Sequence, residues 1–197
     1  MFDQYLSKYI TAAEKYLPDK IRVLFIAESP PFFVDPAKMK YFFFEQCPGN
    51  EMLFTTIFQG VFNYRYRKKQ DDKKALLCRF RKNGLWLIDA VEYPINKRMN
   101  GEKVPDKERI QIIKRPENTR KLLSRLSKLR ENNVLDSETK IILIKATVFF
   151  ALRGALTAHD HKILNKNHIG FPRYTGDSTV VNAINTLLSE TGITVKL

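Results

Sequence analysis

The sequence predicts an α/β protein in which four parallel strands form the central sheet of a three-layer α/β/α fold. Four short apolar runs alternate with segments whose apolar residues recur at helical spacing. The runs lack the apolar–polar alternation of a half-exposed strand, which indicates strands covered by helices on both faces. No repeat, low-complexity tract or linker divides the 197 residues, so we expect 1–197 to be a single domain.

Each element of the first half is predicted by apolar spacing and by the residues that end it. Apolar residues at helical spacing indicate the helices, and β-branched, aliphatic or aromatic runs indicate the strands. In chain order we expect a helix from Phe2 to Leu17 ended by Pro18, a strand over 21–26, a helix over 51–62, a helix that Asp71 or Asp72 can cap and that Gly84 ends, and a strand over 85–91.

The second half repeats the alternation. Pro105 and Asp106 open helical material that runs to about Asn132, with one apolar stripe of leucines facing the core. The remaining expected elements are a strand over 140–146, a short helix over 147–156, a strand over 161–167, and a final helix that Asp177 or Ser178 can cap and that carries Val180, Val181, Ile184, Leu187 and Leu188 inward.

The charge of the chain indicates a polyanionic partner. Lys and Arg number 34 against 21 Asp and Glu, which gives a formal net charge of +13. A balance this basic is typical of nucleic-acid-binding proteins, so DNA is the expected partner. Cys47 and Cys78 are too few for a disulfide framework or a four-thiolate cluster, which fits a reducing setting. Neither a signal peptide nor a membrane-spanning run is seen, so we expect a cytoplasmic protein with no membrane association. We also expect it to be a monomer.

Polar and aromatic residues follow the apolar runs. In parallel sheets, ligands bind beyond the carboxyl ends of the strands, at the switch point of strand order. We therefore expect the residues after the runs to gather around one pocket suited to a flat, polar ring beside a cationic surface. These residues are Glu28, Ser29, Pro30, Pro31, Phe32 and Phe33 after the first run, Asp89 and 92–94 after the second, Lys145 to Thr147 after the third, and Asn167, His168 and 170–173 after the fourth.

Motifs for phosphate-rich or metal cofactors are absent from the sequence. It has no P-loop, no G-x-G-x-x-G fingerprint and no H-E-x-x-H pair. His159, His161 and His168 lie close in sequence, but no cysteine is near them and alternating positions need not converge. We therefore expect no cofactor and no metal site.

Five segments, taken in order, resemble the motifs of the uracil-DNA glycosylase superfamily over most of the chain from Ile21 to Leu188. The family has Gly-Gln-Asp-Pro or Gly-Glu-Ala-Pro-Gly after its first strand, a base-reading asparagine in its second strand, then Arg-Pro-Pro-x-Asn-Arg, a third strand with a small-residue helix, and a His-Pro-Ser loop that wedges into the minor groove. The matching segments are Ala27-Glu28-Ser29-Pro30-Pro31, "LWLIDAV" with Asp89, "EYPINKR" at 92–98, "LIKATVFFALRG", and Phe171-Pro172-Arg173.

The resemblance implies a uracil-DNA glycosylase-like fold and hydrolysis of the N-glycosidic bond of a damaged or deaminated base flipped out of DNA, as in base-excision repair. Ser29 stands where some branches have a water-activating aspartate, so the catalytic candidates are Asp35, with Glu28 and Asp89 behind it. Phe171 occupies the place of the family histidine, three residues after His168. The iron–sulfur cluster of some branches needs four cysteines, so none is expected here.

The candidate binding residues follow from the same segments. Phenylalanines can stack on a flipped base, and an ionised Asp89 only accepts hydrogen bonds, which suits the exocyclic amino group of cytosine or adenine better than ordinary uracil. A buried structural acid is the other interpretation of Asp89. The substrate-binding candidates are Ser29, Pro30, Phe32, Phe33, Phe42, Asp89 and His168, and the DNA-binding candidates are Arg65, Arg67, Lys68, Lys69, Lys97, Arg98, Phe171, Pro172, Arg173 and Tyr174.

Two other classes of function stay open at this point. One is a nucleic-acid-binding protein that has kept the fold without catalysis. The other is an unrelated α/β enzyme that acts on a small anionic ligand. Salt-dependent DNA binding without strand cleavage after alkali favours the first of these, and absence of DNA binding at low salt favours the second.

Overall fold

The central sheet has four parallel strands in the order β2-β1-β3-β4. The computed structural model describes residues 3–33, 39–47, 51–98, 100–172 and 177–196, with the side chains of 3–5 excepted. The strands are β1 (Val23–Ala27), β2 (Leu85–Asp89), β3 (Lys140–Leu143) and β4 (Lys162–Ile163). Strand β1 pairs with β2 from Val23↔Leu85 to Ala27↔Asp89 and with β3 from Val23↔Lys140 onward. The predicted α/β class and parallel sheet are confirmed.

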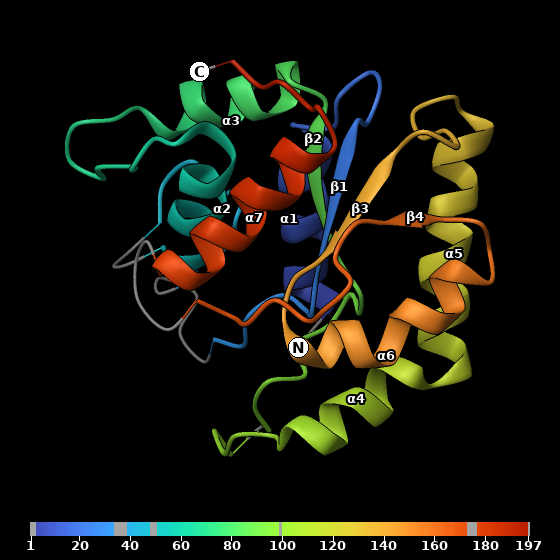
Figure 1. The fold of residues 1–197 in the computed structure, drawn as a ribbon. Helices are drawn as coiled ribbons and strands as arrows, with labels where there is room; N and C mark the ends of the chain where they lie inside the picture. The colour runs from blue at the N-terminus through green and yellow to red at the C-terminus, as the bar shows by residue number, and fades with distance from the viewer. Residues whose placement is uncertain (1–2, 34–38, 48–50, 99, 173–176, 197) are drawn as a thin grey trace.

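The part of the chain that the structure describes has seven helices. They are α1 (Asp3–Glu14), α2 (Met52–Phe62), α3 (Lys73–Lys82), α4 (Asp106–Lys114), α5 (Pro116–Glu131), α6 (Ala146–Thr157) and α7 (Ser178–Glu190). Helices α2, α3 and α7 lie on one side of the sheet, and α5 and α6 lie on the other (Figure 1). The ring of Phe25 packs against Phe80 of α3, whereas the Trp86 indole donates to the Ala13 carbonyl of α1. The side chains of alternate strand positions therefore enter two different helix layers.

The elements match the predicted order, and the main differences have local causes. The helical stretch after Pro105 is two helices, because Pro116 opens α5 and holds the preceding Arg115 in an extended conformation with ψ 135°. Strand β4 covers only 162–163 of the predicted 161–167, although an isolated Ile144↔Ile169 bridge continues the pairing. The caps of α3 and α7 are Asp72, which accepts from Lys74 N, and Asp177, which accepts from Thr179 N.

Helices α2 and α7 cross closely at Gly60. A Cβ atom at this position would lie 2.9 Å from the Ile184 Cβ and 3.1 Å from the Val181 carbonyl oxygen, so a larger residue forces the helices apart. We expect Gly60→Ala to lower the free energy of unfolding by about 1–3 kcal/mol in a urea titration. In the matched control Gly154→Ala, in α6, the new methyl group meets nothing within 4 Å, so the helix is expected to gain about 0.5–1 kcal/mol. Equal effects of the two substitutions would contradict this account of the packing.

In the described ranges, no helix has the length and apolar character that a bilayer crossing requires.

Candidate functional site

A cavity of about 920 Å³ lies beyond the carboxyl ends of β1 and β2, next to the start of α6. The chain leaves β1 toward α2 on one side of the sheet and leaves the neighbouring β3 toward α6 on the other (Figure 1). The ends of β1 and β3 are therefore the topological switch point, where open α/β sheets bind their ligands. Glu28, directly after β1, and Lys145, directly before α6, both line the cavity at this point.

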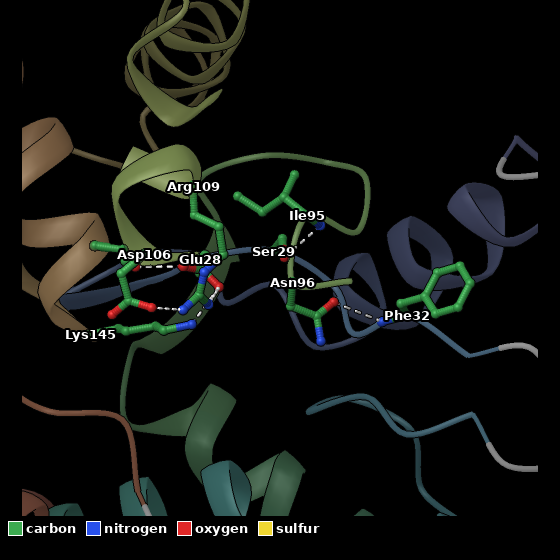
Figure 2. A network of polar contacts seen from close by, with 9 residues as sticks. Glu28, Ser29, Phe32, Ile95, Asn96, Asp106, Arg109 and Lys145 are labelled. Atoms are coloured by element: carbon green, nitrogen blue, oxygen red, sulfur yellow. Dashed lines mark hydrogen bonds and ion pairs between the residues drawn. The ribbon is translucent and has the colours of Figure 1, made fainter. Parts of the chain in front are cut away.

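A buried ionic cluster is centred on the Glu28 carboxylate. Its Oε2 atom accepts from Lys145 Nζ at 2.5 Å and from Arg109 Nη1 at 2.7 Å, and its Oε1 atom accepts from Thr147 Oγ1 at 2.5 Å. The second Arg109 nitrogen, Nη2, donates to Asp106 (Figure 2). Glu28 is only 7% exposed, and two cations face it, so its charge is fully compensated by neighbours from α4 and the β3–α6 junction.

Lys145 has an unusual backbone and an unusual side chain. Its φ of 86° and ψ of 141° lie in a region that non-glycine residues rarely adopt, and such strain is concentrated at functional sites. Burial lowers the pKa of the Lys145 ammonium, an effect that the charge of Arg109 reinforces and the carboxylate of Glu28 opposes. The side chain is 17% exposed, and its Nζ lies 5.5 Å from the centre of the Phe171 ring.

Asp89, the last residue of β2, is the second acidic residue at this end of the sheet. Its side chain bonds Tyr41 and faces the charge of Arg125 on α5, so its partners differ from those of Glu28 although both residues line the cavity. Burial raises the pKa of Asp89 to about 7, against the lowering effects of Arg125 and of a hydrogen bond with Tyr41. The protonated form is therefore populated at a higher pH than for an ordinary aspartate, and this form both donates and accepts.

Aromatic rings form much of the remaining wall. The rings of Phe33, Tyr41, Phe42, Phe54 and Phe171 line the cavity. Phe42 and Phe54 belong to the core, where their ring centroids lie 5.3 Å apart, whereas Phe171 is 43% exposed at the mouth. The cavity therefore combines apolar faces with a few polar groups, as is usual for small-molecule and base-binding sites.

Two hydrogen bonds tie together the loops that leave β1 and β2. Ser29 Oγ accepts from the Ile95 amide at 3.4 Å, and Asn96 Oδ1 accepts from the Phe32 amide at 3.3 Å (Figure 2). A bridge between Lys97 and Lys103 then folds the β2 loop back on itself. Lys40, Lys97 and Lys103 line the cavity, which gives its rim a positive charge.

The structure brings together part of the predicted site. The predicted residues that line the cavity are Glu28, Ser29, Pro31, Phe33, Phe42, Asp89, Lys97, Lys145 and Phe171. Pro30 lines instead a second space of about 320 Å³ between α1 and α5, which shares Tyr41, Leu87 and Asp89 with the cavity. Phe32 joins the two loops through its backbone amide. Pro172 is buried and does not line the cavity.

The other predicted residues lie away from this cavity or outside the described residues. His168 packs against the rings of Phe149 and Phe150 on α6. Arg98 pairs with Glu108 at 2.7 Å, and Arg67 is bound to Tyr64 and Asp71. Arg65, Lys68 and Lys69 lie on the α2–α3 connection, outside the cavity lining. Asp35, Arg173 and Tyr174 lie outside the described residues.

Tyr41 and Arg109 line the cavity but were not among the predicted residues. Lys145 and Thr147 were expected at the pocket from the strand-end rule, although no role was assigned to them; Lys145 lines the cavity, and Thr147 donates to Glu28. Tyr41 belongs to the aromatic segment that supplied the Phe42 candidate. Arg109 comes from a helix face 81 residues after Glu28, and no local pattern indicates such a partner.

Comparison with family models, curated proteins and solved structures finds no match to this chain. Among the described residues, no three His, Cys, Asp or Glu side chains gather closely enough to hold a metal ion.

Proposed function

We propose that the cavity binds a damaged or deaminated base flipped out of DNA and that the protein removes this base by hydrolysis of its N-glycosidic bond. The observation that carries the proposal is Asp89, a buried carboxyl group with a pKa of about 7 on the wall of an aromatic cavity. The sequence resemblance to uracil-DNA glycosylases and the net charge of +13 support the same function.

The cavity suits a base in size and in chemistry. Its volume of about 920 Å³ is within the range of small-molecule sites, and its rings offer faces on which a base can stack. Protonated Asp89 offers a donor and an acceptor on one edge, whereas ionised Asp89 offers acceptors only. The expected preference for an exocyclic amino group therefore applies to the ionised form, above the pKa of about 7.

The same carboxyl group suits the chemistry of base release. Cleavage of an N-glycosidic bond leaves negative charge on the departing base, and a general acid is most effective when its pKa is near the working pH. Protonated Asp89 can donate to the departing base. Glu28 is less suited to donate to the departing base, because both of its oxygens accept hydrogen bonds from Lys145, Arg109 and Thr147.

The lysines at the rim suit the phosphates beside a flipped nucleotide. Lys97 and Lys103 are exposed next to the cavity, and contacts of this kind make binding strongly dependent on salt. DNA contacts from Arg65, Lys68 and Lys69 stay a prediction, since these residues are not among those that line the cavity.

Base release tests the proposal directly. Oligonucleotides that each carry one damaged or deaminated base are incubated with the protein, and the freed base is measured by chromatography. Asp89→Ala is expected to lower the rate of release by about 10²-fold or more, and wild-type release is expected to fall above a pH of about 7. The matched control Asp136→Asn removes a carboxylate at the amino end of β3 and is expected to release the base at the wild-type rate.

Two outcomes contradict the proposal. Salt-dependent DNA binding with no base release from any oligonucleotide indicates a binding protein without catalysis. No DNA binding even at low salt indicates a cavity for a small anionic ligand instead.

A further inference from the structure

Lys145 differs from the other lysines of the cavity in its surroundings. Lys97 and Lys103 are exposed at the rim, whereas the Lys145 side chain is largely buried between Glu28, Arg109 and the Phe171 ring. Its strained backbone is held by a hydrogen bond from its amide to the Ile169 carbonyl and by the first turn of α6, where Phe149 N donates to the Lys145 carbonyl. The fold thus holds one amine at a fixed place in the cavity wall.

We propose that Lys145 forms an imine with the sugar aldehyde of an abasic site in this cavity and so cleaves the DNA strand by β-elimination. This activity rests on the proposed function, since base release produces the abasic site. It adds a second reaction, carried out by a lysine nucleophile, to the hydrolysis of the glycosidic bond.

The surroundings of Lys145 provide what a lysine nucleophile needs. Only a neutral amine attacks a carbonyl carbon, and a desolvated lysine beside another cation loses its proton more readily than an exposed one. Glu28 Oε2 lies 2.5 Å from Nζ and can accept that proton. Arg109 donates to the same oxygen at 2.7 Å, so Glu28 keeps a partner in α4 when Lys145 reacts.

The reaction balances without a redox partner. The Nζ lone pair forms a bond to C1′, and the electron pair of the C=O double bond moves to the aldehyde oxygen. This oxygen takes back the proton held by Glu28 and one proton from Nζ and leaves as water, which gives a protonated imine and returns Glu28 to its carboxylate form. Glu28 then removes a proton from C2′, and the electrons of that C–H bond form a C2′=C3′ double bond. The C3′–O bond breaks, and its electron pair leaves with the 3′ phosphate. Water finally hydrolyses the imine and restores the lysine.

Trapping with borohydride tests the proposal. An oligonucleotide with a preformed abasic site is incubated with the full chain and sodium borohydride, which reduces an imine to a stable secondary amine. We expect a covalent protein–DNA adduct that peptide mass spectrometry maps to Lys145, and we expect Lys145→Arg to lose it. Arginine keeps the positive charge beside Glu28 but has no amine that can form an imine. Loss of the adduct in this variant therefore shows that the Lys145 amine forms it.

Lys140→Arg is the matched control. Lys140 is a partly buried lysine on β3 that faces Glu138 at 3.7 Å, but it lies at the opposite end of the strand from Lys145. This variant is expected to form the adduct at the wild-type level. If Lys145→Arg fails to fold, as measured by circular dichroism, the peptide map of the wild-type adduct still decides the question.

The outcomes separate this proposal from the function on which it rests. An adduct that maps to another lysine, or that persists in folded Lys145→Arg, overturns the role of Lys145. Base release without any adduct on the preformed abasic site overturns the lyase reaction and leaves the glycosylase function intact. An adduct at Lys145 without base release from any oligonucleotide supports the lyase reaction and contradicts the proposed base release.

Discussion

Glu28→Ala is expected to lower the free energy of unfolding by about 3–5 kcal/mol, because it leaves buried cations without their counter-charge. Lys145 and Arg109 both donate to Glu28 Oε2 and are only 17% and 12% exposed, so water replaces the lost carboxylate poorly. Thr147 loses its acceptor as well. The measurement is urea unfolding of wild type and variant at neutral pH, followed by circular dichroism.

Glu108→Ala is the matched control for this prediction. Glu108 pairs with Arg98 at 2.7 Å, but the two side chains are 41% and 49% exposed, so loss of this pair is expected to cost less than about 1 kcal/mol. The loss of unfolding free energy in Glu28→Gln should lie between those of Glu28→Ala and Glu108→Ala, because the amide oxygen can still accept from Thr147 while the negative charge is gone. Similar losses for Glu28→Ala and Glu108→Ala would show that the Glu28 cluster is not stabilised by burial of its charges.

The Glu28 cluster also explains how far the site could be predicted from the sequence. Glu28 and Asp89 are polar residues at the ends of apolar strands, and the parallel-sheet rule brings them to one edge without further information. Arg109 reaches Glu28 from α4. Its position in the sequence of α4 does not distinguish it from an arginine that faces solvent. The partner of a buried charge is set by tertiary packing, which local sequence patterns do not predict.

The fold itself was more predictable than the site, because strand burial and helix amphipathicity are local. The split between α4 and α5 could have been read from Pro116, which disfavours a helical conformation at Arg115. The position of Pro30 could not be predicted from the sequence, because the direction of the chain after β1 depends on packing with α1 and α5. Phe42 shows a third limit: its ring both packs in the core and lines the cavity, so the two interpretations of a phenylalanine are not exclusive.

The stability of the protein is expected to fall with rising pH through the titration of Asp89. Its pKa is about 7 in the folded protein and 3.8 in its ordinary state, so the folded protein binds the proton more tightly than the unfolded chain. The stabilisation of the folded state by this proton is therefore complete below pH 3.8 and is lost as the pH rises to about 7. This difference in pKa between the folded and unfolded states corresponds to roughly 4 kcal/mol in the free energy of unfolding.

Asp89→Asn should remove this pH dependence, because the amide carries no titrating proton and can still accept from Tyr41. We expect the variant to be more stable than wild type at a pH of about 8 and to approach the wild type at a pH of about 4, as measured by urea unfolding across this range. Asp136→Asn provides a control of opposite sign. A hydrogen bond with Lys20 is the main cause that lowers the pKa of Asp136, so its stabilising effect is lost as the pH falls. Parallel pH profiles for wild type and Asp89→Asn would mean that the Asp89 carboxyl group ionises in the fold as readily as in water, and would remove the basis for its role as a general acid.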